Sequence, residues 1–316
     1  MSPLDFDPAH FDRGRKHALE LEVPGHDLKL PLLLVRGASP GKTLVATAAV
    51  HGDEYEGVRA IFDVSAALAP ADLRGDFLAV PVANPPAFWN GTRTSPLDGG
   101  NLARVFPGSY TGPTPAIARS LAEAVIARAD LFVDLHSAGV QWLMPTMVGY
   151  DSNDRRSRAA AAAFGAPVMW GHPAIAPGRT VSFAASRGIP WLYTEARGAG
   201  RIDPGDLRVF VDGLGNLLRH LEILEGAPRP APPALHLYGD GNVDQGLTAS
   251  QRGFLIPEVE LLDRVRAGQR LGRLCGVHGE TLETFAAPAD GVVALVRQFP
   301  VVAPGDPLFL VTGTLQ

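Results

Sequence analysis

Cysteine and lysine are scarce in this sequence of 316 residues, and both scarcities restrict its chemistry. Cys275 is the only cysteine, which excludes a disulfide framework, a cysteine-type zinc site and a redox-active thiol pair. Any bound metal would therefore be held by histidine and carboxylate side chains. Lysine occurs only at Lys16, Lys29 and Lys42, so arginine supplies most of the positive charge.

Long hydrophobic runs and a strong net charge are also missing. No apolar stretch approaches the ~18 residues of a membrane span, and residues 1–8 lack the basic and apolar regions of a signal peptide. The formal net charge is -5 without a basic patch, which gives little support to a nucleic-acid or membrane partner. We therefore expect a soluble, cytoplasmic protein with a small-molecule partner, and homo-oligomerisation stays open.

Apolar runs and amphipathic stretches alternate over residues 1–225. This alternation is typical of an α/β domain in which helices cover a largely parallel sheet. Residues 226–234 are proline-rich, which predicts an extended linker between domains. Over residues 235–316, short β-type runs are broken by Gly, Pro and Asp, which predicts a small all-β domain.

His51 and Glu54 follow the apolar strand expected at residues 43–50. The spacing His-x-x-Glu predicts His51 on the turn after the strand and Glu54 in the first turn of the next helix. Open α/β folds bind ligands at the carboxyl edge of the sheet, so both side chains could converge there. The motif alone is weak evidence, because histidine also caps helices and glutamate favours helix N-termini. A metal site needs a third ligand.

His136 is the candidate for this third ligand, because it follows the apolar strand expected at residues 131–135. Asp134 lies on the same strand face and could accept a hydrogen bond from the imidazole, or it could simply cap a loop. Glu195 follows the strand expected at residues 189–194 and reaches the same edge. Two histidines and one glutamate can hold zinc with one open position, and a further glutamate can take a proton from water. This set of two histidines and two glutamates is typical of a metal-dependent hydrolase.

A long Gly- and Pro-rich segment, residues 84–108, carries Arg93 and Arg104. Long ordered loops in compact domains are usually functional. Either arginine could bind a substrate carboxylate or stabilise the oxyanion of a tetrahedral intermediate. Both could equally be solvated surface side chains.

Four motifs in this order resemble the succinylglutamate desuccinylase/aspartoacylase family of zinc-dependent deacylases, which are related to the zinc carboxypeptidases. They are His51-Gly-Asp-Glu54, Arg104-Val-Phe-Pro-Gly108, Asp134-Leu-His136-Ser137 and Thr194-Glu195-Ala-Arg-Gly198. The resemblance implies a three-layer α/β, zinc-carboxypeptidase-like domain with a mostly parallel or mixed sheet. It also implies hydrolysis of the amide bond of a small N-acyl amino acid through a metal-activated water.

The resemblance further implies a role for each residue of the site. His51, Glu54 and His136 would bind one Zn²⁺ per chain. Glu195 would act as the general base and acid.

The two arginines would contact the substrate. Arg104 would bind its carboxylate and Arg93 would polarise the scissile carbonyl.

One of the motifs departs from the family pattern. The family's usual signature is Asp-Leu-Asn-Arg, whereas this chain has Asn101-Leu-Ala103-Arg104. A lost hydrogen bond to a charged group costs roughly 1.5–3 kcal/mol. Carboxylate recognition would then be weaker, shift to Asn101 or depend on another contact. Aspartoacylase-like and diaminobutyrate-deacetylase-like substrates both stay open.

The C-terminal segment is similar to the flattened, barrel-sandwich-like β domains that carry biotin or lipoate. The similarity lies in residues 286–293 and 302–311. No lysine follows Lys42, so the segment cannot carry either group. We expect a role in packing, in shaping the pocket or in oligomerisation.

Two other function classes fit the same residues. A carboxypeptidase acting on peptides would use the same metal chemistry in a wider cleft. A small β domain that partly covers the site would argue against this class. A non-catalytic metal- or ligand-binding protein would need no general base, so Glu195 argues against that class.

Overall fold

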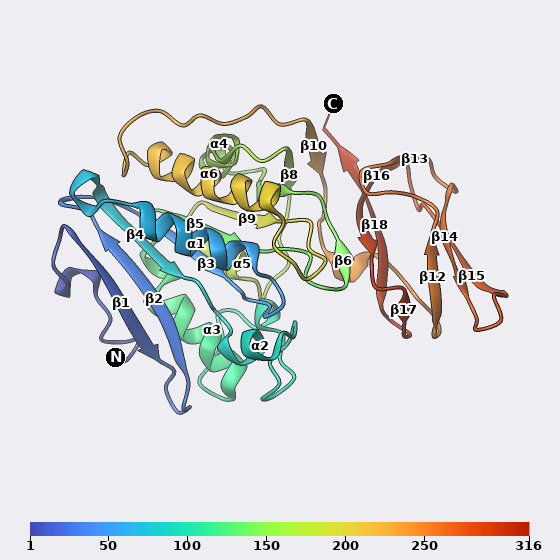
Figure 1. Cartoon of the computed structure of the whole chain (residues 1–316), viewed down its shortest axis with the longest axis horizontal. Helices are drawn as coiled ribbons and strands as arrows, with labels where there is room; N and C mark the ends of the chain where they lie inside the picture. Colours follow the sequence, from blue (N-terminus) through green and yellow to red (C-terminus); the bar gives the residue numbers. More distant parts are fainter. Residues whose placement is uncertain (316) are drawn as a thin grey trace.

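The computed structural model describes residues 1–315 as a large mixed sheet with helices on both faces and a strand-rich part at one end (Figure 1). The helices are α1 (Glu56–Ala67), α2 (Pro85–Asn90), α3 (Pro113–Ala124), α4 (Arg155–Phe164), α5 (Thr180–Ser186) and α6 (Pro204–His220). The strands up to the proline-rich segment are β1 (Arg15–Glu22), β2 (Lys29–Arg36), β3 (Ser39–Ala48), β4 (Arg74–Val80), β5 (Leu131–Leu135), β6 (Trp142–Leu143), β7 (Met147–Asp151), β8 (Val168–His172) and β9 (Trp191–Glu195). The later strands are β10 (Leu235–Tyr238), β11 (Leu247–Thr248), β12 (Gly253–Pro257), β13 (Arg264–Val265), β14 (Arg270–Cys275), β15 (Thr281–Ala286), β16 (Gly291–Arg297), β17 (Val301–Val302) and β18 (Pro307–Thr314).

The centre of the large sheet is parallel and its outer parts are mixed. The strand order is β1-β2-β4-β3-β5-β9-β7-β8-β10, followed by β18-β16-β13. β4, β3, β5 and β9 pair in parallel, whereas β2 pairs antiparallel with β4, and β7 antiparallel with β9. Every residue of β5 is buried, as expected for a parallel strand covered on both faces.

Helices form the two outer layers (Figure 1). One buried apolar cluster joins α1, α4 and α6 to the sheet, and a second joins α3 and α5 to the opposite face. α6 begins where the Asp203 carboxylate accepts hydrogen bonds from the amides of Gly205 and Asp206. The predicted three-layer α/β architecture is confirmed. No helix in the described residues is long and apolar enough to cross a membrane.

The C-terminal strands form two facing sheets around a separate apolar cluster. The second sheet has the order β15-β14-β12-β17. The first of these two sheets, with β18, β16 and β13, continues the large sheet, because β10 pairs with both β8 and β18, and β6 pairs with β16. Residues 226–234 contain no helix or strand. The domain division at this segment stays a prediction.

Two glycines on α6 allow a test of how tightly this helix packs. A Cβ at Gly213 would come within 2.4 Å of the Phe164 ring, whereas a Cβ at Gly215 would meet only the mobile end of Arg219, at 3.3 Å. We expect Gly213→Ala to lower the free energy of unfolding by about 1–3 kcal/mol through overpacking. Gly215→Ala should raise it by about 0.5–1 kcal/mol through helix propensity. Urea unfolding of both variants tests this, and equal effects would contradict the packing described.

Candidate metal and active site

Three neighbouring strands deliver polar residues to the same edge of the sheet. His51 follows β3 after a short turn, His136 directly follows β5, and Glu195 is the last residue of β9. The amide of His136 donates to the carbonyl of Thr194 at 3.2 Å, and the amide of Ala196 donates to the carbonyl of His136 at 3.1 Å. These backbone bonds hold the ends of β5 and β9 together beyond the regular strands.

Glu54 lies between the two histidines. Its Oε1 is 2.8 Å from His51 Nδ1, and its Oε2 is 2.8 Å from His136 Nδ1. Glu54 precedes α1 by two residues, so the expectation that it lies in the first helical turn was wrong. The approach of α1 to β5 depends on Gly57, because a Cβ there would come within 2.6 Å of Leu135 Cβ. A larger residue would push the Glu54 turn away from His136.

An oxygen atom lies within hydrogen-bond distance of Nε2 in each of the two imidazoles and fixes the orientation of the ring. His136 Nε2 lies 2.9 Å from Asp134 Oδ2, and His51 Nε2 lies 3.3 Å from Asn101 Oδ1. Asp134 is itself held by the hydroxyl groups of Thr47 and Thr180. Because these oxygens only accept, each Nε2 carries a hydrogen and each Nδ1 faces Glu54. This arrangement is typical of histidines that bind a metal through the other nitrogen.

The donor set fits a zinc ion. One ligand atom from each of His51, Glu54 and His136 lies within 4.8 Å of the others, and all three residues are buried. Imidazole nitrogen and carboxylate oxygen are ligands that zinc prefers, and three protein ligands leave a position open for water or substrate.

The electrostatics of this group favour a bound cation. Although burial opposes charge, Asp134 and Glu54 raise the pKa of His136 well above its usual value. The charges of His51 and His136 likewise overcome burial and hold the pKa of Glu54 well below its usual value. Burial lowers the pKa of His51 to about 4, and the nearby Arg93 guanidinium acts in the same direction. Two buried carboxylates therefore face the imidazoles and attract positive charge.

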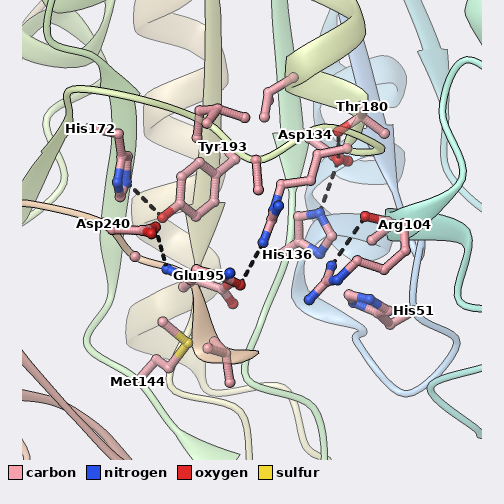
Figure 2. Close-up of a pocket in the computed structure, with 18 of the residues that line it drawn as sticks. His51, Arg104, Asp134, His136, Met144, His172, Thr180, Tyr193, Glu195 and Asp240 are labelled. Atoms are coloured by element: carbon pink, nitrogen blue, oxygen red, sulfur yellow. Dashed lines mark hydrogen bonds and ion pairs between the residues drawn. The ribbon is translucent and has the colours of Figure 1, made fainter. Parts of the chain in front are cut away.

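Glu195 lines the same pocket as both histidines (Figure 2). Its Oε2 is buried and has no hydrogen-bond partner within residues 1–315. Burial, together with the charge of Glu54, raises the pKa of Glu195 to about 8. This carboxyl group can thus exchange a proton near neutral pH.

Arg93 is held between Glu54 and an indole ring. Its Nη1 lies 3.3 Å from Glu54 Oε1, and its guanidinium carbon lies 5.0 Å from the centre of the Trp142 ring. The Trp142 indole nitrogen donates to the Pro307 carbonyl at 3.0 Å. The C-terminal part therefore fixes the ring against which Arg93 packs.

Arg104 also lines the pocket, but a carboxylate of this chain already contacts it. Its Nε and Nη2 donate to the two oxygens of Asp244 at 3.0 and 3.1 Å. Asn101 Oδ1, besides facing His51, accepts the Ala103 amide at 3.0 Å. The Ala103 methyl group, at the position where the family usually has asparagine, lines the pocket.

Sequence reasoning missed six polar residues of this pocket, namely His172, Arg179, Thr180, Tyr193, Asp240 and Asn242. Tyr193 could have been found, because it lies two residues before Glu195 and thus on the same face of β9. Arg179 is half-buried and donates to Asn242 Oδ1 at 2.7 Å. Asp240 and Asn242 belong to the segment after β10, and no motif marks them.

Known proteins share both the sequence and the fold. The profile of the succinylglutamate desuccinylase/aspartoacylase catalytic domain matches residues 40–221. The N-alpha-acetyl-L-2,4-diaminobutyric acid deacetylase of Halomonas elongata is 32% identical over 300 residues, which cover 91% of this chain and 86% of that protein.

Several solved structures match nearly the whole chain. A succinylglutamate desuccinylase/aspartoacylase from Rhodobacter sphaeroides has a TM-score of 0.86 and 30% identity, with 98% of each chain covered. The product-bound ectoine utilization protein EutE from Ruegeria pomeroyi has a TM-score of 0.87 and 28% identity, with 96% of this chain and 97% of that chain covered. The family resemblance of the four motifs is thus confirmed, and the chain belongs to the succinylglutamate desuccinylase/aspartoacylase family.

Proposed function

We propose that this protein is a zinc-dependent hydrolase that cleaves the amide bond of a small N-acyl amino acid. The observation that carries the proposal is a buried His-Glu-His group whose two histidines line one pocket together with Glu195, whose buried Oε2 has no hydrogen-bond partner within residues 1–315. The named activities of its relatives, deacetylation of an N-acetyl amino acid and desuccinylation, support the same reaction type.

His51, Glu54 and His136 would hold one zinc ion per chain. When bound, zinc lowers the pKa of water to about 7 and polarises a carbonyl group. Asp134 and Asn101 keep the two imidazoles oriented for this role through their contacts with Nε2.

Glu195 would be the general base and acid. Its pKa of about 8 and its unpaired oxygen suit a group that takes a proton from water and passes it to the leaving amine. Arg93 would stabilise negative charge on the carbonyl oxygen, since its guanidinium lies next to the metal-ligand group.

Arg104 would bind the substrate carboxylate and would share its guanidinium with Asp244. Arg179, which lines the same pocket, supplies a second positive charge. Asn101 would contact the substrate through its amide nitrogen, because its oxygen is already used by His51 and Ala103.

The pocket wall formed by residues 240–243 favours small substrates over peptides. This segment follows β10, its Asn242 accepts a hydrogen bond from Arg179, and the next residue, Asp244, contacts Arg104, so it restricts the site on one side. We place the reaction in the cytoplasm, without nucleic-acid or membrane partners, and homo-oligomerisation stays open.

Glu195→Gln tests the proposed base. The variant should keep its zinc and lose about 10²- to 10⁴-fold in kcat for N-acetyl amino acids, because the amide cannot accept the proton. The same substitution at Glu258, which pairs with Arg270 in the C-terminal part, is the control and should keep full activity. Full activity of Glu195→Gln would rule out this role.

Removal of the metal tests the proposed ligands. A chelator should abolish turnover, and added zinc should restore it. His136→Ala should bind far less zinc in metal analysis of the purified protein, whereas His236→Ala, in β10 and outside the pocket, should bind the same amount as the wild type. Chelator-resistant activity would contradict the proposal.

Trp142→Leu tests whether the indole positions Arg93. Loss of the ring should lower kcat roughly 3- to 30-fold, with a smaller effect on KM, because the guanidinium loses its support next to Glu54. Trp142→Phe should recover part of kcat. Trp89→Leu, at a tryptophan that is 81% exposed, is the matched control. A fall in melting temperature with unchanged kcat would contradict the positioning role and show that Trp142 only stabilises the fold.

A further inference from the structure

Arg104 lies between two cavities of the structure. One is the pocket that both histidines share with Glu195, which we call the inner pocket (Figure 2). The other, which we call the outer groove, has a volume of about 340 Å³ and is lined by Arg104, Asp244, Thr248 and Pro307, among others. Because Arg104 lines both cavities, it can be contacted from either side.

From the outer groove, Asp244 holds the Arg104 guanidinium through two hydrogen bonds. Nε and Nη2 of Arg104 donate to the two carboxylate oxygens at 3.0 and 3.1 Å, and Nη1 donates to the carbonyl oxygen of Ala103 at 3.1 Å. A guanidinium group binds a free carboxylate through the same kind of paired bonds. A substrate carboxylate can therefore use the Nε and Nη2 pair only when Asp244 leaves it.

Asp244 also responds to the charges of the arginines that we assign to the substrate. Although burial opposes it, the contact with Arg104 and the charges of Arg179 and Arg93 hold the pKa of Asp244 below its usual value. The carboxylate is therefore ionised near pH 7 and lies in the field of three guanidinium groups. In its charge and its contacts, it resembles the carboxylate of a bound amino acid.

Asp244 can leave this contact without disturbing the core. Its side chain is 57% exposed, and none of residues 239–246 is buried. Segments with few buried contacts open at a low free energy. An exposed ion pair also contributes little to stability. The contact between Asp244 and Arg104 is therefore weak enough to be exchanged for another one.

We propose that Asp244 exchanges with the ligand carboxylate on Arg104, so that it yields the guanidinium to the substrate and takes it back from the product. The inference rests on the proposed function, in which Arg104 binds the substrate carboxylate. Hydrolysis of the amide bond releases an amino acid that keeps this carboxylate, so Arg104 would hold the product as firmly as the substrate. The return of Asp244 then favours product release. Arg104 is thus shared in turn, and its charge has a partner throughout the reaction.

The exchange has a consequence for the salt dependence of binding. When a ligand carboxylate replaces Asp244, one ion pair breaks and another forms, so screening by salt affects both sides of the equilibrium alike. Without the charge of Asp244, binding forms an ion pair and breaks none, so salt weakens it. A residue that merely positions Arg104 would not produce this difference.

The experiment compares the wild-type enzyme with Asp244→Asn. The substrates are the N-acetyl derivatives of aspartate, glutamine and 2,4-diaminobutyrate, and the inhibitors are the three amino acids and their α-carboxamides. Asp244→Asn should lower the KM of the substrates and the inhibition constants of the amino acids by about 2- to 5-fold, and leave inhibition by the carboxamides unchanged. With rising salt concentration, the constants for the amino acids should increase in the variant and stay nearly constant in the wild type. Asp244→Ala, which also removes the hydrogen bonds, provides a second measurement.

Asp63→Asn is the matched control. The two oxygens of Asp63 accept hydrogen bonds from Arg59 Nε at 2.7 and 2.9 Å on the surface of α1, and Asp63 lines neither the inner pocket nor the outer groove. This variant loses the same charge from an exposed arginine pair. It should keep the wild-type constants at every salt concentration.

The outcomes separate the inference from the proposed function. Inhibition constants that stay the same or rise in Asp244→Asn would overturn the exchange and leave the deacylase proposal standing. Equal inhibition of the wild-type enzyme by the amino acids and their carboxamides would also overturn it, because Arg104 would then not bind the carboxylate. Failure of the zinc-loaded wild-type enzyme to hydrolyse the three substrates and a panel of other N-acyl amino acids would overturn both.

Discussion

The rest of the site depends on the contacts that the buried Glu54 carboxylate makes with its neighbours. One oxygen meets His51, the other meets His136, and Arg93 approaches the first. The side chain is only 2% exposed, and a buried charge of this kind is stable only with such partners. Without the carboxylate, two imidazoles and a guanidinium would face each other. The close packing of α1 on β5 at Gly57 is therefore required both for the fold and for the contacts of Glu54 with the two histidines.

Residues that follow apolar strands could be predicted from sequence. His136 and Glu195 stand directly at strand ends, and parallel neighbours bring such ends to one edge. The alternation of apolar runs and amphipathic stretches indicated an α/β domain with a helix-covered sheet, whereas the three-layer architecture followed from the family resemblance. The position of Glu54 was less well predicted, because the turn between β3 and α1 is longer than the motif alone indicates.

Contacts between distant parts of the chain could not be predicted. Arg104 and Asp244 are separated by 140 residues, and nothing local to either residue indicates the pairing. The same holds for the strand pair of β8 and β10, which carries Gly239 and Asp240 to His172. Asn101 was identified as a substrate contact, and the side chain lies at the site, but its oxygen faces His51, which only the folded geometry shows.

The segment after β10 gives Arg104 a contact that does not depend on the residue at position 103. In the function we propose, Arg104 already donates to Asp244, so its guanidinium is held without the missing asparagine. A guanidinium shared with a carboxylate of the same chain attracts a second carboxylate less strongly than a free one. Discrimination between substrates then depends more on the side-chain end of the pocket. At that end, the hydrogen-bond chain runs from Gly239 through His172 to Tyr193 and determines where each hydrogen points.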